Sequence, residues 1–183
     1  IASAQINESF VDELICSPMP FVLLERPVNG DRAASVRANS RLGGIQAINY
    51  LVQRGYRRIA FVGGAPAWAS ALERMEGYRQ GMSGNGLQEQ IRIVEGDWTL
   101  ESGYRAAGEL LQSDHPPEAV FAASDMLAIG VLQAARDLNR SVPTDVAVVG
   151  YDDFNAASLV SPALTTIRMP AYELGLKAAE LIA

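Results

Sequence analysis

Short apolar runs alternate with amphipathic stretches from Asn39 onward. The runs are rich in β-branched or aromatic residues and are bounded by turn residues, which is typical of buried strands. They occupy residues 57–64 (RRIAFVGG), 91–97 (IRIVEGD), 118–124 (EAVFAAS) and 145–152 (DVAVVGYD). Successive runs begin at intervals of roughly 30 residues, which is the length of a βαβ unit. The pattern therefore predicts a mostly parallel sheet with helices on both faces.

Four amphipathic stretches supply the expected helices, because their apolar residues recur at helical spacing. They run through residues 42–52, 72–82, 100–111 and 129–138. Gly55 is placed to end the first helix. Ser70 with Glu73 predicts a capping box at the start of the second. Ser124 or Asp125 is a natural N-cap for the last.

The pattern changes near both ends of the sequence. Residues 1–37 contain the end of a helix and a strand stopped by Pro27, and LTTIRMP at 164–170 is another strand stopped by proline. Proline directly after a strand indicates a segment that leaves its sheet. We therefore expect residues 38–168 to form one lobe and residues 1–37 and 169–183 to be parts of a second. Since the sequence lacks an initiator Met and ends in mid-helix, we expect it to belong to a longer chain.

Composition narrows the classes of protein that fit this pattern. The chain of 183 residues is 49% apolar and has a formal net charge of −6, which argues against binding to a phosphate backbone. No apolar run approaches the roughly 20 residues that cross a bilayer, so no membrane partner is expected. Cys16 and His115 are the only cysteine and the only histidine. This excludes an internal disulfide and disfavours a cysteine–histidine metal cage or a histidine-based triad.

Polar and aromatic side chains follow every predicted strand. In open α/β sheets, ligands bind beyond the carboxyl ends of the strands, where helix N-termini point inward. Helix capping explains some of these residues but leaves Trp68, Trp98 and Arg74 without a role. In chain order the residues that follow the strands are Glu25; Pro66, Trp68 and Ser70; Asp97 and Trp98; Ser124 and Asp125; and Tyr151, Asp152 and Asp153.

Arg74, Asp152 and Trp98 together suit a polyhydroxylated ring. An aromatic face stacks on the C–H face of a sugar, while arginine and aspartate bind neighbouring hydroxyls in pairs. Arg74 lies one helical turn beyond Ser70, so both can face the same way. A buried Asp152 carboxylate needs a partner, which Arg74, backbone amides or the ligand can supply. Trp98 has an alternative role as a plug of the surface between the lobes.

Two other kinds of site fit the sequence poorly. The turn VGGAPAW at 62–68 is rich in glycine, but it lacks both the Gly-Lys-Ser/Thr end of a P-loop and the three-glycine dinucleotide spacing. Asp152 and Asp153 make a weak acid–base pair, because consecutive side chains usually point apart. We therefore expect no catalytic residue, cofactor or metal, and interpret the chain as a binding protein rather than an enzyme.

An ordered set of motifs resembles the effector-binding region of the LacI/GalR family of bacterial transcription regulators. The set includes RLGGIQAINYLVQRGYRRIAFVGG, FAASDMLAIGVLQAARDLNRSVPTDVAVVGYDDF and SPALTTIRMP, and the match runs from about residue 20 to residue 183. The resemblance implies an α/β, periplasmic-binding-protein-like fold with two lobes, each built on a doubly wound, mostly parallel sheet. It also implies a homodimer, a small effector in the cleft between the lobes, and an N-terminal helix-turn-helix domain that is absent from this sequence.

The resemblance also implies particular effector-binding residues. Arg74, Trp98, Ser124 and Asp152 match positions where the family contacts its effector, and Ser70 and Glu25 match in the same way. Many members carry Asn in place of Ser124 and Asp in place of Glu25, so the match does not identify the effector.

The function expected on these grounds is that of a ligand-sensing domain in a cytoplasmic, DNA-binding transcriptional repressor. A sugar-like effector would couple closure of the lobes, hinged near Arg37 and Arg168, to the affinity for operator DNA. The first alternative is a periplasmic sugar-binding protein of an ABC transporter, which has the same fold. The second is an α/β enzyme that acts on sugars or nucleotides.

Overall fold

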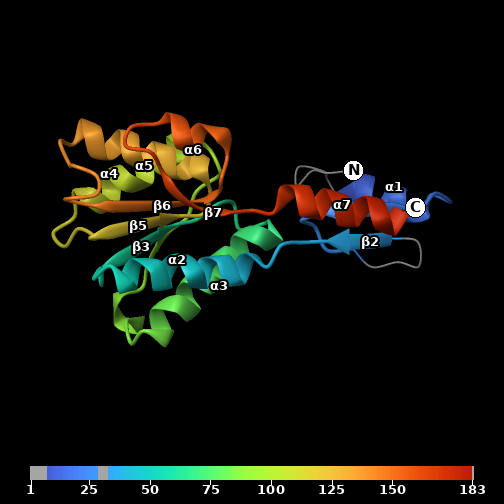
Figure 1. The fold of residues 1–183 in the computed structure, drawn as a ribbon, viewed down its shortest axis with the longest axis horizontal. Helices are drawn as coiled ribbons and strands as arrows, with labels where there is room; N and C mark the ends of the chain where they lie inside the picture. The colour runs from blue at the N-terminus through green and yellow to red at the C-terminus, as the bar shows by residue number, and fades with distance from the viewer. Residues whose placement is uncertain (1–7, 29–32, 183) are drawn as a thin grey trace. The chain divides into compact units, whose positions relative to one another are not determined.

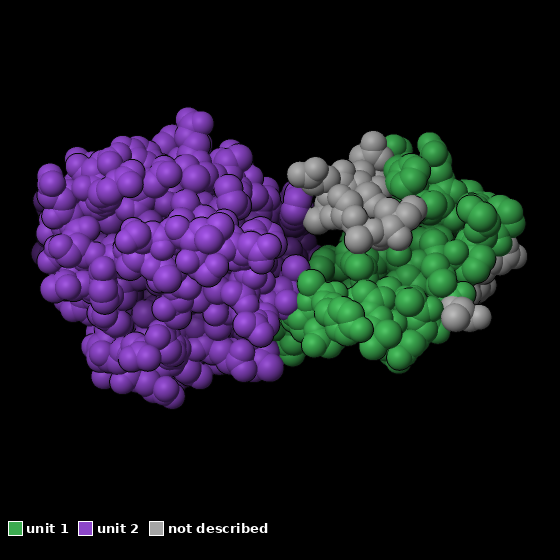
Figure 2. Space-filling model, turned by 45° about the horizontal axis from the view of Figure 1, so that its top comes forward, with its two compact units in different colours: residues 1–39, 170–183 green, residues 40–169 purple. Residues whose placement is uncertain are grey.

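The chain divides into two compact units in the computed structural model, which describes residues 8–28 and 33–182. Unit 1 consists of Ile1–Asn39 with Pro170–Ala183, and unit 2 of Ser40–Met169. Figure 2 shows the two units in different colours. The chain passes between them at Asn39–Ser40 and again at Met169–Pro170. That unit 1 is part of a second sensor lobe stays a prediction.

Unit 2 is built on a five-stranded parallel sheet with the order β4-β3-β5-β6-β7. Phe61 of β3 lies opposite Phe121 of β5, which lies opposite Val149 of β6. The predicted parallel α/β sheet is confirmed. Its strands are β3 (Ile59–Val62), β4 (Arg92–Val94), β5 (Ala119–Ala122), β6 (Ala147–Asp152) and β7 (Thr165–Arg168).

Helices cover both faces of this sheet (Figure 1). On one face lie α2 (Ser40–Gln53) and α3 (Ala69–Gly84); on the other lie α4 (Leu100–Leu111), α5 (Asp125–Asp137) and α6 (Asn155–Leu159). A short 3-10 turn, η1 (Gln88–Gln90), precedes β4. Glycines let paired helices approach closely. A Cβ at Gly44 of α2 would lie 2.7 Å from the Arg74 carbonyl oxygen of α3, and one at Gly130 of α5 would collide with the Leu100 carbonyl oxygen of α4.

Three aromatic rings fill the core between the sheet and α3. Phe61 lies 5.3 Å from Tyr78 and 5.3 Å from Phe121, measured between ring centroids. The buried Tyr78 hydroxyl donates to the Ile59 carbonyl (2.8 Å) and accepts from the Arg92 amide (2.9 Å), so α3 is bonded to two strands. Burial raises the pKa of Tyr78 to about 12, because the phenolate would lose its hydration there.

Unit 1 contains α1 (Glu8–Cys16), the parallel strands β1 (Phe21–Leu24) and β2 (Ala33–Val36), and α7 (Ala171–Ile182). Its small apolar core consists of Val11, Phe21 and Leu23. The helix α7, from the far end of the chain, packs on β1 and β2. Unit 1 is therefore discontinuous in sequence, whereas unit 2 is one uninterrupted segment.

The helix caps match the expectation in two places out of three. Gly55 has φ 96°, as expected for the glycine that ends α2. The Ser124 hydroxyl caps α5 by accepting from the Leu127 amide (3.2 Å). The capping box predicted for Ser70 and Glu73 is wrong.

The start of α3 shows why that capping box does not form. The helix begins at Ala69, and its N-cap is Trp68, which makes no side-chain cap bond. Trp68 has extended backbone (φ −100°, ψ 130°), and its carbonyl accepts from the amides of Ala71 and Leu72. Ser70 therefore lies inside the first helical turn, where its hydroxyl is not in the capping position.

Candidate functional site

The carboxyl end of β6 brings Asp152 against Arg74. Asp152 is the last residue of β6, and Arg74 projects from α3. Arg74 Nη2 lies 3.1 Å from Asp152 Oδ1, and the two side chains are only 5% and 9% exposed. Of the partners expected for Asp152, which were Arg74, backbone amides and the ligand, the structure shows Arg74. Because both charges are withdrawn from water, each depends on the other for its stability.

Further contacts fix the plane of the Arg74 guanidinium group. Its Nη1 donates to the Ala123 carbonyl at the end of β5 (2.5 Å). Its Cζ lies 3.7 Å from the centroid of the Tyr151 ring and 5.6 Å from that of the Trp98 ring, both within range of a cation–π interaction. Within the described residues, Arg74 Nε has no hydrogen-bond partner. The cation is thus held on several sides and retains one unused donor.

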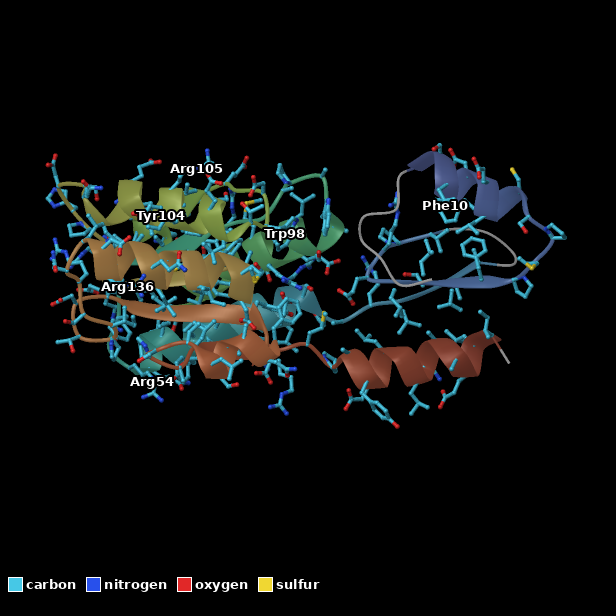
Figure 3. The ribbon with its side chains drawn as sticks, turned by 90° about the horizontal axis from the view of Figure 1, so that it is seen from above. Phe10, Arg54, Trp98, Tyr104, Arg105 and Arg136 are labelled. Carbon is cyan, nitrogen blue, oxygen red and sulfur yellow. The ribbon has the colours of Figure 1, made fainter. Side chains whose placement is uncertain are left out.

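Trp98 is held over the strand ends by its own loop. Its ring leaves no space for a Cβ at Gly64, and it lies 5.4 Å from the Trp68 ring. In Figure 3, Trp98 lies in unit 2 well away from the labelled Arg54 and Arg136. Trp98 Nε1 is buried and has no hydrogen-bond partner among the described residues. The site therefore contains two buried donors, one on a cation and one on a neutral ring, that no described residue of the chain uses.

Hydrogen bonds at Asp97 and Thr99 set the path of the Trp98 loop. The Thr99 hydroxyl (2.5 Å) and amide (3.0 Å) both donate to Asp97 Oδ1. These bonds, led by that of the hydroxyl, lower the pKa of the Asp97 carboxyl. The same Thr99 hydroxyl accepts from the Ser102 amide (3.1 Å) and so caps α4. The loop and the helix that follows it are therefore fixed by one pair of side chains.

The backbone is strained where these loops meet the strands. Trp98 (φ 73°), Asp152 (φ 114°) and Asp153 (φ 61°) have positive φ, and so has Glu25 (φ 56°), directly after β1. Such conformations cost about 1–3 kcal/mol at a non-glycine residue and cluster at ligand-binding sites. In the described part of the chain, Asn139 (φ 55°) is the one other non-glycine residue of this kind.

The remaining predicted residues take different positions. Ser124 is buried, and its hydroxyl accepts from the Leu127 amide; it directly follows Ala123, whose carbonyl holds Arg74. Ser70 is half-buried on α3, one turn before Arg74. Glu25 belongs to unit 1, where its carboxylate accepts from the Ala38 amide (2.5 Å). The structure thus joins Arg74, Asp152 and Trp98 directly and places Ser124 at the adjoining strand end.

Two residues at the candidate site, Tyr151 and Asp125, have roles that the sequence did not reveal. Tyr151 supplies the ring beneath Arg74, and its hydroxyl lies so close to Gly43 of α2 that a Cβ there would come within 2.5 Å. The Gly43–Gly44 pair within a predicted helix is the signal that could have indicated such a close approach. Asp125 was expected only as a possible cap, yet it is fully buried and bonds outside its own helix.

The chemistry of this arrangement is that of recognition. The Arg74–Asp152 pair is neutral as a unit and lies beside two tryptophan rings. Such an arrangement can accept a neutral molecule rich in hydroxyls, which would bond to the two donors without adding an unpaired buried charge. Among the described residues, no cluster of His, Cys, Asp and Glu has the arrangement needed to hold a metal ion. The helices of the described part also include none long and apolar enough to span a membrane.

Known proteins with a similar sequence are transcription regulators. The chain is 32% identical to catabolite control protein A of Priestia megaterium over 182 residues, which cover 98% of this chain and 55% of that protein. It is 40% identical to the ribose operon repressor of Escherichia coli K12 over 159 residues, which cover 86% of this chain and 48% of that protein. The chain thus spans about half the length of these relatives.

Solved structures agree with this relationship. A LacI family transcriptional regulator from Enterococcus faecium, solved with bound ribose, matches with a TM-score of 0.87 at 27% identity, covering 99% of this chain and 67% of that one. The sequence model of the periplasmic binding protein-like domain matches residues 48–183. The fold expected from the motifs is confirmed. The chain belongs to the family of periplasmic binding protein-like domains, in the form found in LacI-family regulators.

Proposed function

We propose that this chain is the ligand-sensing part of a DNA-binding transcriptional repressor whose effector is a sugar bound by Arg74, Asp152 and Trp98. The observation that carries the proposal is the buried Arg74–Asp152 pair at the strand ends, with Trp98 beside it. The relatives support a sugar as the effector, because one is named for the ribose operon and one solved structure holds ribose.

The proposed binding mode follows from the donors and acceptors of the pair. Asp152 accepts from sugar hydroxyls, Arg74 donates to them, and the indole of Trp98 packs on the C–H face of the ring. An unpartnered buried donor costs about 1–3 kcal/mol, so a ligand that reached Arg74 Nε or Trp98 Nε1 would recover that energy. Ser124 and Ser70 would add hydroxyl contacts.

The proposed coupling to DNA is a shift between conformations. A ligand moves such an equilibrium only by its difference in affinity for the two states. We assign operator binding to a helix-turn-helix domain outside this sequence, in a cytoplasmic homodimer. The net charge of −6 supports this, because an acidic chain is poorly suited to contact phosphates itself. The relatives, about twice as long as this chain, have room for such a domain.

The test is a ligand screen followed by one matched pair of variants. Ribose, cellobiose, a hexose 6-phosphate and a purine base are compared by thermal shift, since a ligand at 100 times its Kd stabilises the fold by about 2.7 kcal/mol. Calorimetry then measures the best ligand against Asp152→Asn and Asp153→Asn. Asp153 is the matched control, because its carboxylate pairs with the exposed Arg168 (2.6 Å) and not with Arg74.

We expect a neutral sugar to bind and Asp152→Asn to weaken it by about 2–4 kcal/mol, the loss of a charged hydrogen-bond anchor. Asp153→Asn should stay within about 0.5 kcal/mol of the unaltered chain. If no compound in the panel stabilises the chain, or if both variants bind equally well, the sugar site is in the wrong place.

A further inference from the structure

The turn that carries Asp152 rests on a second, fully buried carboxylate. Asp125 is the first residue of α5, and none of its surface is exposed. Its Oδ2 accepts from the Phe154 amide (2.7 Å), and its Oδ1 accepts from the Thr166 hydroxyl of β7 (2.5 Å). One side chain thus bonds the start of α5 to the turn after β6 and to the neighbouring strand.

The same carboxylate lies directly against the seam between β6 and β7. Gly150 of β6 is paired with Thr166 of β7, and a Cβ at Gly150 would collide with Asp125 Oδ1. Glycine is therefore required at position 150 for the carboxylate to reach Thr166. The carboxylate of Asp125 therefore packs directly against the backbone of Gly150, which precedes Asp152 by two residues.

The bonds of Asp125 do not serve to cap α5. The Ser124 hydroxyl already accepts from the Leu127 amide, so the helix has its N-cap without Asp125. Burial raises the pKa of the Asp125 carboxyl, the nearby Asp153 adds to this rise, and the bonds from Thr166 and Phe154 oppose it. The carboxylate is thus kept in an unfavourable environment, and its hydrogen bonds from Phe154 and Thr166 both come from outside α5.

The turn needs such an anchor because two consecutive residues have positive φ, Asp152 (114°) and Asp153 (61°). Strained conformations of this kind persist only where the surroundings determine them. Besides the Arg74–Asp152 pair itself, Arg168 Nε bonds Asp153 Oδ2 at this turn, and these two side chains are 81% and 32% exposed. Exposed pairs hold geometry weakly. The bond from the Phe154 amide to the fully buried Asp125 carboxylate is a stronger restraint than this exposed pair.

We propose that Asp125 is a positioning residue of the effector site: it holds the turn at residues 152–154 so that the Asp152 carboxylate faces Arg74, and it ties that turn to β7. The inference rests on the proposed function, because the site it positions is the sugar site. β7 is also the strand from which the chain leaves unit 2 at Met169–Pro170. Asp125 therefore links the effector-binding turn to one of the two connections between the units.

Two variants of α5 test the proposal. Asp125→Ala removes both bonds, whereas Val131→Ala, at another fully buried position of the same helix, lowers stability without touching the turn. Ribose affinity, or that of the best compound from the screen, is measured at a temperature where both variants are folded. We expect Asp125→Ala to weaken binding about tenfold or more and Val131→Ala to change it less than about twofold.

Asp125→Asn supplies the conservative rescue. Its amide oxygen can still accept from the Phe154 amide, while its nitrogen donates to a rotated Thr166 hydroxyl. Affinity should therefore lie between that of the unaltered chain and that of Asp125→Ala. If Asp125→Ala does not fold, Thr166→Val, which removes only the Oδ1 bond, replaces it, with an expected loss of about threefold or more. Unchanged affinity in the folded variant overturns the proposal, as does an equal loss in Val131→Ala.

A measurement without ligand separates this inference from the proposed function. Amide exchange at Phe154 should accelerate about tenfold or more in Asp125→Ala and stay unchanged in Val131→Ala, after correction for global stability. If no compound in the panel binds the unaltered chain, the proposed sugar site is refuted independently of Asp125. The exchange rate of the Phe154 amide then decides alone whether Asp125 holds the turn. Equal exchange in both variants refutes the positioning role.

Discussion

Replacing Arg74 by methionine removes the cation from a pair whose side chains are 5% and 9% exposed. Breaking a buried pair from one side costs about 3–5 kcal/mol, because it leaves an uncompensated charge. The Ala123 carbonyl also loses its donor, a cost of about 1–3 kcal/mol that overlaps with the first. We therefore expect Arg74→Met to lower the free energy of unfolding by about 3–5 kcal/mol.

A double-mutant cycle with Asp152→Asn isolates the interaction between the two side chains. Once Asp152 is replaced by the neutral Asn, loss of Arg74 no longer leaves an unpaired buried charge. The double variant should therefore be more stable than the sum of the two single losses predicts. The coupling should be about 1–3 kcal/mol. A smaller loss than about 1 kcal/mol in Arg74→Met, or strict additivity, would refute the view that the two charges depend on each other.

Urea unfolding provides the assay. Circular dichroism and tryptophan fluorescence are recorded together, since coincident transitions are needed before one free energy is assigned to a chain with two units. Arg136→Met is the matched control. Arg136 pairs with Asp137 at 3.6 Å, but their side chains are 75% and 51% exposed. Its loss should cost about 0–1 kcal/mol.

Two further predictions concern the core of unit 2. Tyr78→Phe should cost about 1–3 kcal/mol at neutral pH, because the Ile59 carbonyl and the Arg92 amide lose their partner. The Tyr78 pKa rises from 10.0 to about 12 on folding, so its stabilisation is complete below pH 10 and is lost as the pH approaches 12. Between pH 9 and 11, the free energy of unfolding measured with urea should therefore fall less steeply with pH in Tyr78→Phe than in the unaltered chain. An identical dependence on pH in both chains would contradict this. Gly130→Ala should lower stability by about 1–3 kcal/mol, since its Cβ meets the Leu100 carbonyl. The control Gly175→Ala, which meets nothing within 4 Å, should be neutral or stabilising in thermal unfolding.

The sheet and its helices could be predicted from sequence because a strand buried on both faces must be continuously apolar. All four residues of β3 and all four of β5 are buried, and both strands were recognisable as apolar runs. Periodicity was less informative about exposure. Leu42 and Leu72 lie on predicted apolar stripes but are 47% and 46% exposed. A stripe identifies the apolar face of a helix, but not which of its residues a neighbouring element covers.

The candidate site could be predicted only in part. Arg74, Asp152 and Trp98 were identifiable, because an arginine and two loop tryptophans had no structural role at the strand ends. The role of the Ala123 carbonyl could not be predicted. Its contact with Arg74 depends on β5 lying beside β3, the strand that precedes α3, and strand order is not encoded in hydrophobic periodicity. The capping box failed for a related reason. Ser70 and Glu73 have the right spacing, but the backbone at Trp68 starts the helix two residues earlier.

The discontinuity of unit 1 has a consequence for synthesis. Because a ribosome makes the chain from its N-terminus, all five strands of the unit 2 sheet emerge before α7 does. The nascent chain can therefore complete the larger sheet while β1 and β2 still lack the helix that packs on them. Premature termination after Met169 would release a complete unit 2 attached to a strand pair that lacks α7, a substrate for chaperones and proteases.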